Sequence, residues 1–80
     1  MKSEKNRRQF LNLCALIREL RQRHNLSQRE MAALLGVGVH TLRQLEAGRV
    51  PPRVSVRIVY RIYDAFGIPP AAQFDPERLV

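Results

Sequence analysis

The sequence predicts an all-α fold, a compact bundle of five helices in a single domain that spans residues 1–80. The chain is rich in Leu, Ala, Arg, Gln and Glu, which favour helix, and its strand-forming residues do not alternate with polar residues over any long stretch. Apolar residues recur at three- and four-residue steps near the N-terminus. Glycines and prolines then divide the chain at short intervals, which predicts short helices joined by turns.

The first helix is expected over about residues 4–24. Its apolar residues share one helical face, which predicts that the following side chains are buried: Phe10, Leu13, Cys14, Leu16, Ile17 and Leu20. Asn25 follows this segment, and asparagine tolerates the left-handed conformation in which helices often end. The sequence therefore predicts a long helix that stops at Asn25.

Two short helices are expected next. Ser27 can cap the first of them, and Glu30 stands three residues later, which completes a capping box. The expected buried residues of this helix are Met31, Leu34 and Leu35. Gly36 is expected to end it, because glycine adopts a positive φ without strain. The next helix is expected over about Val39–Ala47, with Gly48 at its end.

The last third of the chain predicts two more helices. Segment 49–53, RVPPR, is expected to be a loop, because a proline disfavours helical conformation in the residue before it. Ser55 is then expected to cap a fourth helix, which Gly67 ends. Its expected inner face consists of Val56, Val59, Tyr60, Ile62, Tyr63 and Phe66. A short fifth helix is expected near Pro70–Phe74, followed by a tail over residues 75–80.

The short helices carry a recognisable pattern over about residues 28–47. Counted from Gln28, alanine stands at the fifth position, glycine at the ninth, and apolar residues at the fourth, eighth, tenth, fifteenth and eighteenth. This spacing resembles the helix-turn-helix motif of DNA-binding proteins, in which two helices meet at a sharp turn. The longer stretch LSQREMAALLGV…TLRQLEAG, followed by a loop with prolines, resembles the Cro/CI-type (Xre) family of bacterial and phage regulators.

The resemblance has functional implications. It implies a lambda repressor-like domain that binds double-stranded DNA at specific sequences and regulates transcription by occupying an operator. It also implies a homodimer on a two-fold operator. Two alternatives remain open: the antitoxin component of a toxin–antitoxin pair, and a helix-turn-helix protein-interaction module without sequence-specific DNA binding. A protein partner, a toxin or a polymerase, is not identified by the sequence.

The third helix is the expected reader of bases. On a helical wheel, Leu42 and Leu45 face the core, and the expected exposed arc consists of Val39, His40, Arg43 and Gln44. Arginine can bond O6 and N7 of guanine, glutamine can pair with adenine, and valine can rest on a thymine methyl group. An alternative interpretation, considered above all for His40, is that such a side chain simply faces water.

Phosphate contacts are expected around this helix. The net charge of +7 fits either a polyanionic partner or a merely solvated surface. Twelve of the fourteen cations are arginine, whose planar fork matches phosphate. The expected phosphate contacts are Ser27, Gln28, Gly38, Arg49 and Arg53. Capping alone would also explain Ser27, and Gly38 can be read either as a weak N-cap or as a site of close approach to phosphate.

Glu46 is an acid on the expected DNA-reading helix. Its wheel position lies beside Leu42, toward the edge of the core. The resemblance implies that Glu46 pairs with an arginine of the first helix, and Arg21 occupies the matching position. The alternative is an exposed acid that tunes sequence specificity.

The expected dimer surface lies near the C-terminus and consists of Ile68, Phe74, Leu79 and Val80. The alternative is that Ile68 and Phe74 complete the core and that dimers form only on DNA.

Other classes of protein are not favoured by the sequence. The two histidines, one cysteine and seven acids show no spacing typical of a metal site, and no glycine-rich phosphate loop occurs, so neither an enzyme nor a cofactor is expected. A single cysteine, Cys14, excludes an internal disulfide and is typical of a reducing compartment. No signal peptide or membrane span is recognisable, and a cytoplasmic protein is expected.

Overall fold

Five helices and no strand are found in the part of the chain that the structure describes. The structure is a computed structural model that describes residues 2–49 and 56–74, with side chains from residue 8 onward. The helices are α1 (Lys2–Arg23), α2 (Gln28–Leu35), α3 (Val39–Glu46), α4 (Arg57–Phe66) and α5 (Pro70–Gln73). The prediction of an all-α bundle is confirmed.

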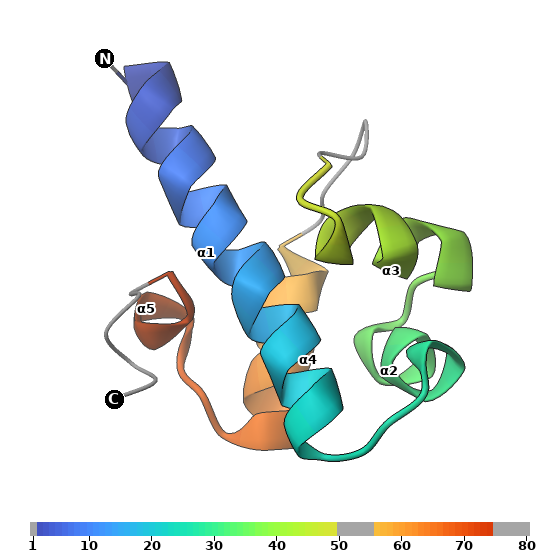
Figure 1. Ribbon diagram of the computed structural model, residues 1–80. Helices are drawn as coiled ribbons and strands as arrows, with labels where there is room; N and C mark the ends of the chain where they lie inside the picture. The colour runs from blue at the N-terminus through green and yellow to red at the C-terminus, as the bar shows by residue number, and fades with distance from the viewer. Residues whose placement is uncertain (1, 50–55, 75–80) are drawn as a thin grey trace.

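Helix α1 lies at the centre of the arrangement. Figure 1 shows it as a long rod with α5 on one side and the α2–α3 pair on the other. It packs against α3 and α5, while α4 packs against α2 and α5. The core consists of Leu13, Cys14, Leu16, Ile17, Leu20, Met31, Ala32, Leu35, Leu42, Leu45, Ile58 and Ile62. The buried face predicted for α1 is therefore confirmed, with Phe10 at its half-buried edge.

Three successive helices end in the same way, at a residue with positive φ. Asn25, Gly36 and Gly48 have φ values of 55°, 70° and 76°. After each of them, the next N–H group bonds a carbonyl five residues back, as in the bond from Val37 N to Ala32 O of 3.0 Å. This pattern closes a helix by satisfying its last carbonyl groups. The helix ends predicted at Asn25 and Gly36 are confirmed.

The N-terminus of α2 carries the predicted capping box. The Glu30 backbone N–H donates to Ser27 Oγ at 3.0 Å, and the Ser27 N–H donates to Glu30 Oε1 at 2.8 Å. These bonds from Ser27, first of all that of its backbone N–H group, hold the pKa of Glu30 below its ordinary value. The start of α2 is thus defined by side chains that were readable in the sequence.

The buried faces of α2 and α4 differ from the prediction. Leu34 is 40% exposed. At α4, the side chains of Tyr60 and Tyr63 and of Val56, the residue before the helix, are also exposed, whereas Ile58 and Ile62 are buried. Seven of the ten residues of α4 are apolar, so periodicity alone cannot choose its inner face. Tertiary packing makes the isoleucine side the inner one, because Ile58 and Ile62 belong to the common core. Ser55, the predicted cap, lies outside the described residues.

Helix α5 is held to α1 and α4 by side-chain amides. Gln73 is completely buried, and its Nε2 donates to the carbonyl oxygens of Val59 at 2.7 Å and Ile68 at 3.0 Å. Asn12 Nδ2 of α1 donates to the Phe74 carbonyl at 3.0 Å. The short fifth helix therefore closes one end of the core, one residue shorter than predicted. In the described ranges, no helix is long and apolar enough to cross a membrane.

Candidate nucleic-acid interface

Helix α3 has a buried side and an exposed side. Leu42 and Leu45 are completely buried and hold the helix on the core. On the opposite side, His40 and Arg43 are exposed and Gln44 is half-buried. Val39 differs from the prediction, because it is half-buried and packs against the core. The polar groups that α3 offers to a partner are therefore those of His40, Arg43 and Gln44.

The turn between α2 and α3 sets the angle of the two helices. Gly36 has φ 70° and ψ 31°, in the left-handed region that favours glycine. A Cβ atom at this position would lie 3.1 Å from Cζ of Arg61, so the arginine of α4 lies against the turn. Val37, the next residue, packs against the core. The backbone conformation therefore favours Gly36, whereas the flexible, exposed side chain of Arg61 could shift to admit a Cβ atom.

Gly38 caps α3 without a side chain. Its backbone is extended, with φ −74° and ψ 157°, and its carbonyl accepts a bond of 3.0 Å from the Leu42 N–H group. A Cβ atom at Gly38 would meet nothing within 4 Å. Neither backbone conformation nor packing therefore demands glycine here, and the exposed backbone of Gly38 is open to a partner.

An ion pair joins α1 to α3. Arg21 Nε donates to Glu46 Oε2 at 2.6 Å, and Arg21 Nη2 donates to Glu46 Oε1 at 3.0 Å. The two side chains are only 19% and 6% exposed. The hydrogen bond with Glu46 raises the pKa of Arg21. Glu46 therefore lies at the edge of the core, and the alternative of an exposed acid is wrong.

The same arginine also contacts the loop before α2. Arg21 Nη1 donates to the carbonyl of Leu26 at 3.2 Å. One guanidinium thus bonds the end of α3 and the chain segment that leads into α2. This contact positions both helices of the motif relative to α1.

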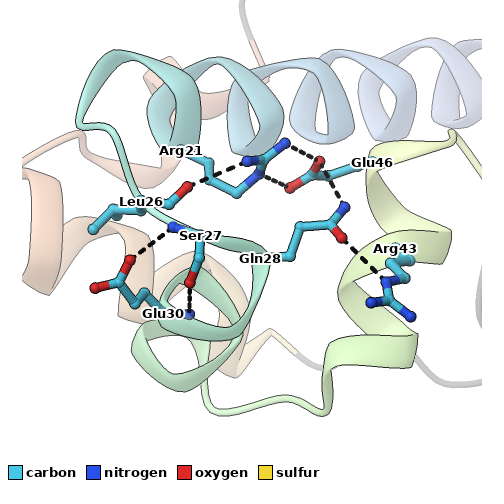
Figure 2. Close-up of polar contacts among 7 residues, drawn as sticks. All are labelled: Arg21, Leu26, Ser27, Gln28, Glu30, Arg43 and Glu46. Carbon is cyan, nitrogen blue, oxygen red and sulfur yellow. Dashed lines mark hydrogen bonds and ion pairs between the residues drawn. The ribbon is translucent and has the colours of Figure 1, made fainter.

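Glu46 is in turn connected to the exposed side of α3, as Figure 2 shows. Gln28 Nε2 donates to Glu46 Oε1 at 3.5 Å, and Arg43 Nε donates to Gln28 Oε1 at 3.1 Å. The half-buried Gln28 therefore lies between a buried acid and an exposed cation. Sequence reasoning missed this contact, because no local pattern relates residues 28 and 43.

The remaining predicted phosphate contacts have different positions. Ser27 is exposed and is engaged in the capping box. Arg49 is exposed directly after α3, and its N–H group bonds the Gln44 carbonyl at 2.9 Å. Arg53 lies outside the described residues. Within those residues, no group of three or more His, Cys, Asp or Glu side chains could hold a metal ion.

Comparison with known families agrees with this geometry. Residues 12–74 match a family described as helix-turn-helix domain. The match runs from the buried face of α1 to the end of α5 and so includes α2, the turn and α3. No significant match was found to a curated protein or to a solved structure.

Proposed function

Because the chain belongs to the helix-turn-helix domain family, we propose that it binds double-stranded DNA at specific sequences and regulates transcription by occupying an operator. The observation that carries the proposal is the two-sided character of α3. Leu42 and Leu45 anchor it on the core, and polar side chains of three chemical kinds project from its other side. A helix presented in this way can enter the major groove.

Each polar residue of α3 suits a base edge. The guanidinium of Arg43 can donate to O6 and N7 of guanine, and the amide of Gln44 can pair with adenine. His40 can donate to a base acceptor or to a phosphate. We also propose a contact of Val39 with a thymine methyl group, made by the part of this half-buried side chain that remains accessible.

Phosphate contacts would set the position of α3 in the groove. We propose this role for Ser27 and Gln28 at the start of α2, for the open backbone of Gly38, and for Arg49 and Arg53 after α3. The net charge of +7 supports the proposal, since each neutralised phosphate releases counterions and strengthens binding.

We further propose that the chain binds as a homodimer on a two-fold operator, with half-sites about 34–36 Å apart. Of the expected surface, Ile68 and Phe74 are half-buried against the core, and Leu79 and Val80 lie outside the described residues. Three exposed apolar residues lie instead at α4: Val56, directly before the helix, and Tyr60 and Tyr63 within it are 70%, 58% and 47% exposed.

The α4 surface is complementary to itself. Val56 and Tyr63 are seven residues apart, and so are Arg57 and Asp64. If two copies of α4 pack antiparallel across a two-fold axis near Tyr60, Val56 of each copy faces Tyr63 of the other. In this register Arg57 lies within one helical turn of Asp64 of the second copy, so the charges at the edge of the contact are opposite in sign.

The function is tested by selecting bound sequences from a random DNA pool and titrating variants against the selected and a scrambled site. Loss of a bidentate base contact costs about 1–3 kcal/mol, so we expect Gln44→Ala to lower affinity for the selected site roughly 5- to 150-fold. Affinity for scrambled DNA should hardly change, because it depends on phosphate contacts. Arg43→Ala should lower both affinities, since it also removes a charge.

The control is Gln9→Ala, which removes the same amide from an exposed position of α1. It should leave the ratio of the two affinities unchanged. If Val39, His40, Arg43 and Gln44 can each become alanine with the ratio intact, α3 does not read bases. The protein-interaction module would then be the better description of the chain.

A further inference from the structure

We propose that Gln28 is a positioning residue that orients the guanidinium of Arg43 so that its two terminal nitrogens read a guanine. The proposal rests on the proposed function, because it concerns how that same helix recognises bases. It assigns to Gln28 a role in addition to the proposed phosphate contact, to which the second N–H of the amide can donate. It also extends the ion pair of Arg21 and Glu46 into a chain of contacts that reaches the surface (Figure 2).

The chemistry of its two neighbours determines how the Gln28 amide is turned. The Glu46 carboxylate only accepts hydrogen bonds, and the Arg43 guanidinium only donates them. The amide therefore has to direct Nε2 to Glu46, at 3.5 Å, and Oε1 to Arg43, at 3.1 Å. The opposite orientation would place two donors together on one side and two acceptors on the other. Gln28 is thus suited to lie between an acid and a cation.

The inner end of this chain of contacts is fixed. Glu46 is 6% exposed and is held by two bonds from Arg21, which is itself bonded to the Leu26 carbonyl. Hydrogen bonds between charged groups are strong when they are withdrawn from water. Exposure then rises outward along the chain, from the nearly buried Glu46 to the half-buried Gln28 and the exposed Arg43. A surface arginine is in this way connected to the core.

The bond to Gln28 uses Nε of Arg43, one edge of the planar guanidinium. The two Nη groups at the far end stay available to a base, and two parallel N–H donors match O6 and N7 of guanine. Holding Nε restricts the rotation of a long side chain before DNA arrives, which reduces the ordering that binding requires. Gln28 would therefore increase discrimination without touching a base.

The test separates positioning from phosphate contact by a double-mutant cycle. The variant Gln28→Met keeps the length of the side chain and removes both amide groups, and Gln28→Ala repeats the test if methionine disturbs packing. Each is titrated with and without Arg43→Ala, against the selected and the scrambled site. Gln9→Ala again serves as the control for loss of an exposed amide.

We expect Gln28→Met to lower the ratio of specific to non-specific affinity roughly 3- to 10-fold, and to have no further effect on the ratio once Arg43 is alanine. The guanines of the selected site are then replaced one at a time with 7-deazaguanine, which lacks the N7 acceptor. At one position, this replacement should lower the DNA affinity of the parent by a larger factor than that of Gln28→Met. In NMR spectra recorded without DNA, the Nε–H resonance of Arg43 should have a different chemical shift in Gln28→Met than in the parent.

Two results would overturn the positioning role. One is that Gln28→Met lowers the affinity for both DNAs equally, and by the same factor with arginine or with alanine at position 43. This is the behaviour of a phosphate contact alone. The other is an unchanged ratio in Gln28→Met while Arg43→Ala still lowers it. Neither result touches the proposed function, which fails only if the substitutions on α3 itself leave the ratio intact.

Discussion

The ion pair of Arg21 and Glu46 allows a stability prediction that needs no DNA. The substitution Glu46→Ala removes a carboxylate that is 6% exposed. The Arg21 guanidinium, which is 19% exposed, then keeps its hydrogen bond to the Leu26 carbonyl (Figure 2). Breaking a fully buried ion pair costs roughly 3–5 kcal/mol, because the remaining charge is left without compensation.

Two effects reduce this cost. Arg21 is partly exposed and can turn further toward water. Glu46 is the last residue of α3, where an acid is unfavourable to the helix dipole, so its removal regains about 0.3–1 kcal/mol. We therefore expect Glu46→Ala to lower the free energy of unfolding by about 2 kcal/mol. For a chain of this size, a loss of about 1 kcal/mol in the free energy of unfolding lowers the melting temperature by about 4–8 °C. The melting temperature of Glu46→Ala should therefore fall by about 8–16 °C.

The assay is thermal unfolding followed by circular dichroism at low protein concentration. The matched control is Glu19→Ala, which breaks the pair of Glu19 and Arg23 on α1. That pair has a similar distance, 2.9 Å, but its side chains are 38% and 55% exposed. An exposed pair of this spacing contributes about 0.3–0.5 kcal/mol, so the control should melt within a few degrees of the parent. Equal melting temperatures for the two variants would refute the reasoning from burial.

Three further predictions follow from other parts of the molecule. Arg49→Ala should reduce the slope of log K against log salt by roughly one unit and weaken all DNA sequences about equally; an unchanged slope would exclude Arg49 from the phosphate contacts. The pKa of Glu30 is lowered in the folded state, so its ionised form stabilises the protein above the ordinary value of 4.5 and this contribution is lost as the pH falls through the folded pKa. The difference in melting temperature between the parent and Glu30→Gln should therefore be present at pH 7 and shrink below about pH 4.5, whereas a constant difference would contradict the capping argument. Tyr60→Asp should abolish dimers at tens of micromolar in sedimentation, with Leu34→Asp as a control at another exposed apolar position, and a parent that stays monomeric would exclude the α4 contact.

The helix boundaries were predictable because the interactions that end a helix are local. The hydroxyl of Ser27 and the carboxylate of Glu30 lie within one turn of each other, and a positive φ at Asn25 or Gly36 depends on the residue itself. The buried face of α1 was predictable for a related reason. Polar residues interrupt its apolar stripe at regular steps, so only one face can be the inner one.

Helix α4 shows where this reasoning stops. Its apolar residues cover most of its circumference, and the prediction placed Tyr60 and Tyr63 inside and omitted Ile58. The choice between the two sides is made by tertiary packing: α4 packs against α2 and α5, with its isoleucines in the common core and its tyrosines exposed. The sequence of α4 by itself does not indicate on which side of the helix α2 and α5 pack.

For the candidate interface, the sequence was sufficient to place α3 and the turn at Gly36, because spacing and glycine conformation are properties of the chain itself. The approach of Arg21 to Glu46 was inferred from a family resemblance and not from local chemistry. The contact of Gln28 with Arg43 was decided by tertiary structure alone. These residues lie fifteen positions apart, and their side chains meet only because the turn brings the start of α2 alongside α3. A hydrogen bond depends on distance and direction in space, and these quantities exist only once the helices have packed.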